Sequence, residues 1–533
     1  MSDFSDAYCV IGSGLSGVSA ARGLIDAGKK VLMLDVGLEL PKKNAERVDV
    51  LASKPAWKWK SSEKDILTEG VEASAGGVKE KFLFGSNFAS RVLDQFPREL
   101  IESKFYMSFA RNGLGNIWGG GLLPVHAEDM RDWPITPQEL EPYYSKVLRY
   151  APLSGRSDSL EKTYPLYCKP SFHAPSKQAS ALLSKLERNG RKLEDSGLSF
   201  GASRLAARFH GRKEGYECQY CGMCLHGCPY GIAYSGSETL DELEQDGNFT
   251  YQKGFLVKRL EPETDGVVIY GTDPKSGQAL EPVRVKKAFL AAGVFSTTKI
   301  MLESLGIKEK SVRVLNSDQF YTPLFSMRGM PRVTEESLHA MCQIFLILRN
   351  KGLSPYTIHF SLYTYNQLYK QALDGILGPT AGLFSPFVKL FLSRLFFSIS
   401  YLHSSESSYL EARLKNDAQG TMVVNSVAAP EAIDVMNRGR MHLLKLSPYT
   451  GLVPVLGYKG QKIPGAGNHS GGSFPMKQNP KGLETDSLGR VPGFSNVHLV
   501  DASILSSVPA TSITFSIMAN ALRIADCVGN DER

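Results

Sequence analysis

The chain has 533 residues, too many for one compact core, so two domains are expected. Its 42% hydrophobic and 22% charged residues and its mean hydropathy of −0.17 are typical of a soluble globular protein. The formal net charge of +7 comes from dispersed basic residues without a coherent basic stripe, which argues against nucleic-acid binding. We see no apolar run of about 18 residues, as a spanning helix needs, and no signal peptide, so a cytoplasmic location is expected.

The first predicted element is a strand over residues 7–11, followed by a glycine-rich turn and a helix. Gly12, Gly14 and Gly17 have the G-x-G-x-x-G spacing, and a second apolar strand ends in Asp35. The first glycine permits a tight turn, the second lets a pyrophosphate approach the backbone, and the third lets helix and strand pack closely. With the acid on a ribose hydroxyl, the pattern predicts dinucleotide binding but does not separate FAD from NAD. An ordinary βαβ turn is the alternative.

A polar insertion and a glycine-rich loop come next. Residues 38–82 have little periodicity, which is typical of an insertion. Within residues 106–135, the stretch 113–121 carries Asn116 and Trp118 among five glycines. Glycine lets a backbone approach a ligand closely, so we expect this loop to pass beside one, with a flexible surface loop as the alternative. The residues concerned are Gly113, Gly115, Asn116, Trp118, Gly119, Gly120 and Gly121.

The middle of the chain alternates helical and strand-like patterns. Helices are predicted over 137–150 and around 179–187, and residues 251–293 are β-rich. The last apolar run of that segment ends in Ala292 and Gly293 and leads into a helix. This sequence of features is typical of a parallel strand that returns to a dinucleotide-binding sheet.

The second half of the chain predicts a different architecture. Residues 312–365 alternate in strand-like segments, which indicates an antiparallel sheet. Residues 383–402 form the most hydrophobic segment, with apolar residues at helical spacing, interrupted by Lys389 and Arg394. A packed helix, a helix lying in a membrane interface and, least favoured, a spanning helix are the interpretations considered.

Four of the eight cysteines crowd into residues 216–231. Cys218, Cys221, Cys224 and Cys228 have the spacing C-x2-C-x2-C-x3-C-P, which matches the cysteine run of bacterial ferredoxins. The spacing favours an iron–sulfur cluster, [4Fe–4S] or [3Fe–4S]. A zinc site and a metal-free cysteine-rich loop are the alternatives, since zinc motifs usually split into two separated knuckles.

Residues 466–526 complete a series of blocks that resembles the glucose–methanol–choline (GMC) FAD-dependent oxidoreductases. The other blocks are the N-terminal glycine motif, the glycine-rich loop and the segment 289–302, in the same order. The similarity is greatest to the gluconate- and fructose-dehydrogenase-like branch, where a cysteine-rich insert also occurs and some members carry an iron–sulfur cluster. Residues from about 310 to 455 match no such block.

The resemblance implies an α/β fold, α+β overall. A Rossmann-like FAD-binding domain would be interleaved with a second domain built on an antiparallel sheet with helices. We assign residues 1–310 to the FAD-binding domain, with insertions at 38–82 and 216–231. Residues 311–455 would form the substrate domain, and 456–533 would return to the FAD-binding domain.

The resemblance also implies roles for individual residues. His469 takes the place of the family's catalytic histidine, and a neutral imidazole suits a base that works near pH 7. Ser512 falls where the family has a second His or Asn, and it is predicted to help hold the substrate hydroxyl. The implied cofactor-binding residues are Gly12, Gly14, Gly17, Asp35, Gly113, Asn116, Gly119, Val257, Ala292, Gly293, Asp501 and Thr514.

The resulting functional prediction is an FAD-dependent dehydrogenase that oxidises an alcohol or sugar hydroxyl by hydride transfer to flavin. The cysteine cluster would pass electrons to an acceptor other than oxygen, such as a quinone, a cytochrome or a redox protein. The departure at Ser512 keeps a flavin-dependent reductase or a redox-neutral sugar epimerase open. An FAD-binding electron-transfer subunit is the third interpretation. The segment 383–402 suggests a lipid-linked substrate and peripheral contact with the inner face of a membrane.

Overall fold

The computed structural model describes residues 4–68, 73–74, 77–78, 82–210, 217–380, 382–458, 460, 463–467 and 469–531. Part of the predicted insertion 38–82 lies outside the described residues, and so does Tyr216 at the start of the cysteine-rich segment. Among the helices described, none combines the length and the apolar composition that crossing a membrane requires.

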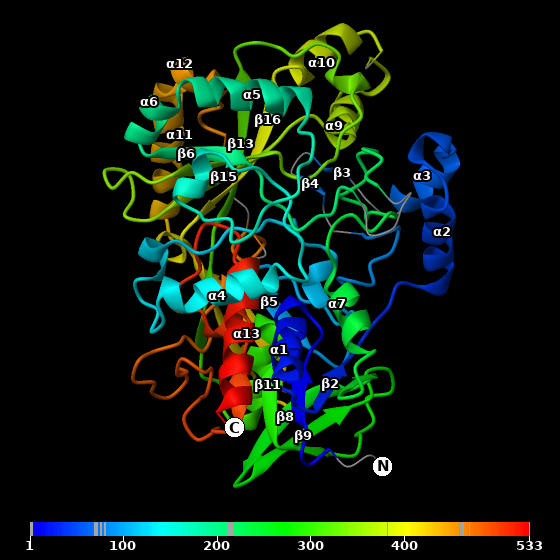
Figure 1. Ribbon diagram of the computed structural model, residues 1–533, viewed down its shortest axis with the longest axis vertical. Helices are drawn as coiled ribbons and strands as arrows, with labels where there is room; N and C mark the ends of the chain where they lie inside the picture. Colours follow the sequence, from blue (N-terminus) through cyan, green and yellow to red (C-terminus); the bar gives the residue numbers. More distant parts are fainter. Residues whose placement is uncertain are drawn as a thin grey trace.

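A five-stranded parallel sheet forms one half of the molecule, with the strand order β21-β11-β1-β2-β7 (Figure 1). Strands β1, β2, β11 and β21 are buried almost throughout, as expected for a sheet covered on both faces. The predicted first, second and returning strands are confirmed. The strands are β1 (Tyr8–Ile11), β2 (Val31–Asp35), β7 (Phe249–Lys253), β11 (Lys287–Leu290) and β21 (Val497–Leu499).

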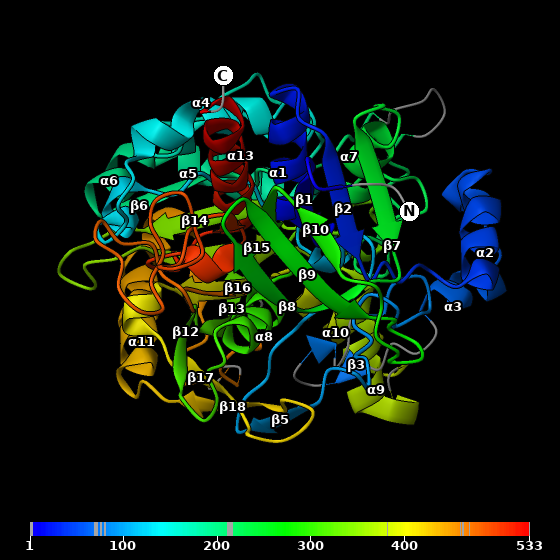
Figure 2. The ribbon, with the colours of Figure 1, turned by 90° about the horizontal axis from the view of Figure 1, so that it is seen from below.

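Helices α1 (Leu15–Asp26) and α13 (Thr514–Asn530) lie side by side next to this sheet (Figures 1 and 2). They approach closely because a glycine lies at their contact: a Cβ on Gly23 would be 3.0 Å from Ala525 Cβ. The C-terminal region is thus packed against the N-terminal dinucleotide motif, and both chain ends lie at this end of the molecule (Figure 1). The β-rich middle segment forms an antiparallel sheet of β8 (Leu256–Glu263), β9 (Gly266–Thr272) and β10 (Val283–Val285), and helix α8 (Val294–Ser304) follows it.

A six-stranded antiparallel sheet forms the other half, with the order β19-β13-β16-β15-β14-β6. Helices α5 and α11 cover one of its faces and share a hydrophobic core with it. Strand β6 comes from within residues 1–310, which were assigned to the FAD-binding domain. The elements are β6 (Leu198–Ala202), β13 (Gln319–Ser326), β14 (Ile344–Leu348), β15 (Ile358–Tyr363), β16 (Leu395–Leu402), β19 (Leu452–Pro454), α5 (Lys177–Arg188) and α11 (Glu431–Lys445).

A mixed five-stranded sheet has the order β20-β12-β17-β18-β5, and its β20 carries the C-terminal region into contact with the second half of the chain. Its strands are β5 (Arg98–Ile101), β12 (Val312–Asn316), β17 (Tyr409–Leu414), β18 (Met422–Val427) and β20 (Ser470–Gly471). The remaining elements are α2 (Lys42–Ala52), α3 (Ser61–Thr68), α4 (Pro137–Val147), α6 (Gly190–Asp195), α7 (Gly236–Leu243), α12 (Ser447–Thr450), β3 (Ala73–Ser74) and β4 (Gly77–Val78).

The segment 383–402 is not one helix, so the helical prediction was wrong for its second half. Only α10 (Ser385–Leu392) is helical, and it packs beside α9 (Gln367–Leu377). The remainder is β16, paired over its length with β13 and β15. Its sequence LFFSISYL alternates between the two faces of the sheet, and two flanking strands from elsewhere in the chain stabilise this extended form over a helix.

Candidate active site

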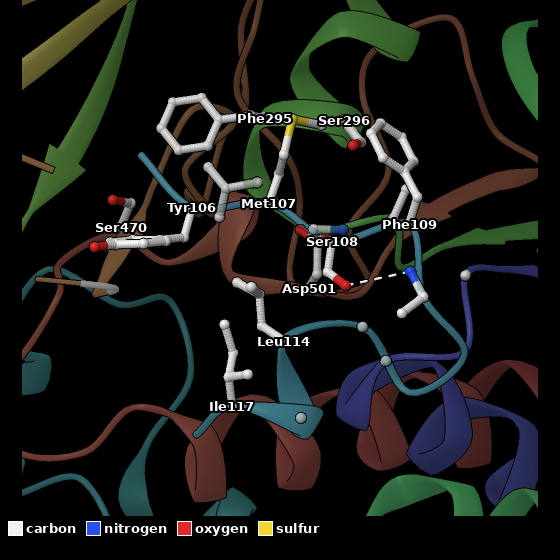
Figure 3. A pocket seen from close by; sticks show the side chains of 18 of the residues that line it. Tyr106, Met107, Ser108, Phe109, Leu114, Ile117, Phe295, Ser296, Ser470 and Asp501 are labelled. Carbon is white, nitrogen blue, oxygen red and sulfur yellow. Dashed lines mark hydrogen bonds between the residues drawn. The ribbon is translucent and has the colours of Figure 1, made fainter. Parts of the chain in front are cut away.

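A single cavity of about 1150 Å³ brings the predicted site residues together. It is lined by the turn after β1, the glycine-rich loop, the start of α8, the C-terminal region and one face of the six-stranded sheet. Figure 3 shows part of this lining, including Leu114 and Ile117 from the glycine-rich loop, Phe295 and Ser296 from α8, and Asp501. The predicted residues that line it are Gly12, Gly14, Asp35, Gly113, Asn116, Gly119, Val257, Ala292, Gly293, His469, Asp501, Ser512 and Thr514.

The three glycines of the β1–α1 turn differ in the space around their α-carbons. Gly12 has φ +99°, and a Cβ there would lie 2.6 Å from Ala291 O. A Cβ on Gly17 would lie only 2.0 Å from Gly12 O, so this glycine permits close packing and does not line the cavity. A Cβ on Gly14 would meet nothing within 4 Å. The backbone at Gly14 is therefore open to the cavity.

The N-terminus of α1 faces this open space without a capping side chain, and its first turn contains no acidic residue. The first N–H groups of such a helix are available to an anion, and the helix dipole favours negative charge there. These features fit the diphosphate of a dinucleotide.

Asp35 lies at the end of β2, buried at the edge of the cavity. Its carboxylate accepts hydrogen bonds from the Ser13 hydroxyl and from Tyr251 Oη, the latter at 3.2 Å. Burial raises the pKa of Asp35 to about 6, although these hydrogen bonds oppose the shift. A ligand hydroxyl that donates to the carboxylate would stabilise its charged form further.

Asn112 fixes the glycine-rich loop, and the sequence analysis did not single it out. It has φ +71° and is fully buried. Its backbone N–H donates to Ser13 Oγ at 3.0 Å, and its side-chain oxygen accepts from the Gly236 N–H at 2.9 Å. The loop is thereby bonded to both the dinucleotide turn and α7. Asn116 donates to the carbonyls of Arg111 and Gly113, so its amide nitrogen shapes the loop itself.

Asp501 anchors the start of α8 at the cavity (Figure 3). Its carboxylate accepts from the Gly293 N–H at 2.8 Å, the Thr297 hydroxyl at 2.5 Å and the Ser503 N–H at 2.9 Å. Burial raises the pKa of Asp501, while these donors oppose that shift. The acid therefore holds Gly293, where the returning strand ends, against the C-terminal region.

One face of the six-stranded sheet supplies the aromatic part of the cavity. Alternate residues of β13, β15 and β16 point to the same side, and the register aligns Tyr321 with Ile399 and His359 with Tyr401. The described lining residues from these three strands include no Asp, Glu, Lys or Arg. They are Gln319, Tyr321, His359, Ser361, Tyr363, Phe397, Ile399 and Tyr401.

His469 lies where the aromatic face meets the dinucleotide side of the cavity. Its ring stacks on Tyr401 with centroids 4.6 Å apart, and its carbonyl accepts from the Ser317 N–H at 2.9 Å. The residue immediately precedes β20, which pairs with β12, so the mixed five-stranded sheet holds the backbone that carries the imidazole.

His359 is a second histidine in the cavity that the sequence analysis missed. Its Nε2 lies 3.3 Å from Ser361 Oγ. Burial, and then the nearby His469 imidazole, lower the pKa of His359 to about 3, so this ring is neutral at pH 7. A strand-like segment with alternation could have indicated that His359, Ser361 and Tyr363 share a face, but nothing local indicated that this face meets His469.

Ser512 lines the cavity, but its hydroxyl donates to Gly121 O at 2.6 Å. Its proton is therefore used to hold the glycine-rich loop. The oxygen can still accept a hydrogen bond, whereas donation to a substrate would require the loop contact to break.

The four cysteines of the predicted cluster border a small core, and Cys224 also lines the cavity. The Tyr220 N–H donates to Cys218 Sγ and the Ala340 N–H to Cys224 Sγ, both at 3.4 Å. Among the described residues, however, no three His, Cys, Asp or Glu side chains converge as a metal site requires. The iron–sulfur cluster therefore stays a prediction that rests on the spacing of the cysteines.

The fold and the site are those of an α/β protein with a dinucleotide-binding turn. Its six-stranded sheet lines one side of a large cavity that also contains His469. No family model matches the chain. It is 26% identical over 304 residues to 6'''-hydroxyparomomycin C oxidase of Streptomyces lividus, covering 56% of this chain and 50% of the relative. It is 25% identical over 306 residues to paromamine 6'-oxidase of Streptomyces fradiae, covering 56% and 49%. The chain thus matches about half the length of these relatives.

The fold is similar over nearly the whole length to the crystal structure of pyridoxine 4-oxidase from Mesorbium loti, with a TM-score of 0.58, 14% sequence identity and 99% of each chain covered. The predicted fold class is therefore confirmed. The similarity to the two oxidases and this fold agree with the resemblance noted in the sequence, and membership of the GMC oxidoreductase family stays a prediction. The assignment to its gluconate- and fructose-dehydrogenase-like branch stays a prediction.

Proposed function

We propose that the protein is an FAD-dependent oxidoreductase that oxidises a CH–OH group, with His469 as the base. One observation carries the proposal: a single cavity joins the dinucleotide turn to His469. The residues present fit FAD, because the space at Gly14 and the uncapped N-terminus of α1 suit its diphosphate, while Asp35 suits its ribose. The relatives named as oxidases and pyridoxine 4-oxidase support the same reaction class.

When bound, FAD would supply the acceptor for the hydride that leaves the carbinol carbon. The hydroxyl proton must leave as well, and His469 is placed to accept it at an imidazole nitrogen. The stacking on Tyr401 limits the orientations of the His469 ring. His359, neutral at pH 7, can donate one hydrogen bond to the substrate oxygen while the charge there develops.

We further propose a neutral substrate. The strands that line the aromatic part of the cavity contribute no charged side chain among the described residues. A charged group bound there would lack an ion-pair partner, so its desolvation free energy would not be compensated. Tyr321, Tyr363 and Tyr401 combine flat apolar faces with hydroxyls. Such surfaces suit the rings or chains of a neutral alcohol or sugar derivative.

The test is reduction of the bound flavin under argon by a panel of neutral alcohols and sugar derivatives. A substrate should abolish the visible absorbance of oxidised flavin, and His469→Gln should slow that step by about 10²–10⁴-fold at unchanged flavin content. His442→Gln, on α11 and outside the cavity, is the matched control and should leave the rate unchanged.

The alternatives give different results in the same cuvette. A reductase or epimerase would show no flavin reduction by any alcohol, yet its chemically reduced flavin would be reoxidised by an enone or a ketone. An electron-transfer subunit would also show no flavin reduction by any alcohol, and it would exchange electrons with a redox partner at the same rate in the parent and in His469→Gln. Either result would overturn the proposed reaction.

A further inference from the structure

The hairpin of α9 and α10 exposes a large apolar surface at one end of the molecule, at the top of Figure 1. Helix α10 is apolar on two sides. Its inner side buries Val388 and Leu392 in a small core. Its outer side leaves Phe387 and Leu390 exposed at 70% and 56%. The other exposed apolar residues of the hairpin are Ile376, Leu383, Phe384 and Phe391.

Basic residues border this apolar surface, and Asp374, the acidic residue of the two helices, is paired with Lys370 at 2.5 Å. Residues 375–405 contain no Asp or Glu but do contain Lys389 and Arg394. Arg394 donates to Met327 O, which brings it to the strand end that carries the exposed Arg328. Large apolar side chains with basic residues at their border are complementary to the interface of a bilayer that contains anionic lipid.

The hairpin is continuous with the cavity. Tyr369 of α9 lines the cavity and packs on Phe397 with ring centroids 5.7 Å apart, and Phe397 packs on Tyr321 at 5.2 Å. A row of aromatic rings therefore leads from the exposed hairpin to the uncharged face of the cavity. A partner that covers the hairpin would lie next to the apolar end of the substrate site.

We propose that α9 and α10 seat the protein in the interface of an anionic membrane, so that a neutral, lipid-soluble alcohol reaches the cavity from the bilayer. The membrane contact stands on the exposed surface and its charges alone. The substrate route rests on the function proposed for His469 and the flavin.

The test is flotation of the FAD-loaded protein with vesicles of equal parts phosphatidylcholine and phosphatidylglycerol. The parent should float, and Phe387→Asp combined with Leu390→Asp should lower the partition coefficient by about 100-fold, because two large apolar side chains no longer enter the interface. Lys389→Glu, high salt and vesicles of phosphatidylcholine alone should each weaken binding. The matched control is Met441→Asp on α11, where the parent side chain is 44% exposed, and it should float like the parent.

Three results would overturn the proposal: a parent that stays with the soluble fraction, a double variant that floats like the parent, or a parent dimer that the double variant converts to monomer. The last result would identify the surface as a contact between two copies of the chain. Both replaced side chains are exposed, so the double variant is expected to fold. Its flavin content and melting temperature, compared with those of the parent, check this. Flotation does not depend on turnover, and failure of the proposed reaction would leave it unchanged.

Discussion

Two single-methyl substitutions in the β1–α1 turn should separate the stability of the fold from the binding of FAD. A Cβ at Gly17 would lie 2.0 Å from Gly12 O and 3.0 Å from Gly12 C, and both atoms belong to the backbone of the turn. No side chain can move aside to relieve this contact. Overpacking costs about 1–3 kcal/mol, and a clash with backbone belongs at the upper end of that range. We therefore expect Gly17→Ala to destabilise the FAD-free protein by about 3 kcal/mol.

Gly14→Ala should have the opposite profile. The residue has φ −63°, which any amino acid adopts, and its Cβ would meet nothing within 4 Å. The free energy of unfolding without FAD should change by less than about 0.5 kcal/mol. The added methyl would instead occupy cavity space at the N-terminus of α1, where a diphosphate would approach, so we expect the affinity for FAD to fall about tenfold or more.

The assays are thermal melting of the FAD-free proteins and the flavin content of each variant after purification. Gly17→Ala should melt well below the parent, and Gly14→Ala should melt with the parent yet retain little flavin. Equal melting of the two variants would refute the packing argument at Gly17. Full flavin content in Gly14→Ala would refute the placement of the diphosphate at this turn.

Two further predictions concern ionisable groups of the cavity. Asp35 keeps its proton to about pH 6 when folded, against 3.8 ordinarily, so the folded state binds more protons in that window and stability falls as pH rises through it. The free energy of unfolding should fall by about 3 kcal/mol across the whole window, and Asp35→Asn should remove this pH dependence. Melting of the FAD-free proteins at about pH 4 and about pH 7 measures the difference. The same pH dependence in parent and variant would contradict the raised pKa of Asp35. His359→Gln should lower kcat/KM by about 10–100-fold. The acidic limb of the pH–rate profile should stay unchanged above about pH 5, because the pKa of His359 is about 3. Loss of that limb in the variant would instead identify His359 as the titrating base.

The dinucleotide turn was predictable because its determinants are local. The spacing of Gly12, Gly14 and Gly17 reflects contacts within one βαβ unit, and Asp35 ends the next strand of the same unit. The positions of Asp501 and His469 came from a family resemblance. Their convergence on the cavity depends on β20 and β21, which pair with strands far away in the chain.

The failures involve residues whose setting is decided by distant segments. Apolar residues in 383–402 satisfy a helical period, yet β13 and β15 hold 395–402 as a strand. The sequence around His359 did not distinguish it from other histidines in strands, because its place in the cavity depends on His469 from the C-terminal region. The sequence predicted that Ser512 occupies the position of the family's second His or Asn, but it did not predict the hydrogen bond to Gly121. In each case local pattern left two structures open and tertiary pairing selected one.

The packing of α13 against α1 and the pairing of β21 with β11 also constrain how the chain folds during synthesis. The N-terminal strands emerge from the ribosome first, but the sheet to which they belong gains its last strand only when the C-terminal region is free. The second sheet, whose strands lie between them in the sequence, can form earlier. We therefore expect the parallel sheet to be completed after the six-stranded sheet, because pairing of strands so far apart in the chain is slow. Until then, apolar surface of the nascent dinucleotide motif would stay exposed.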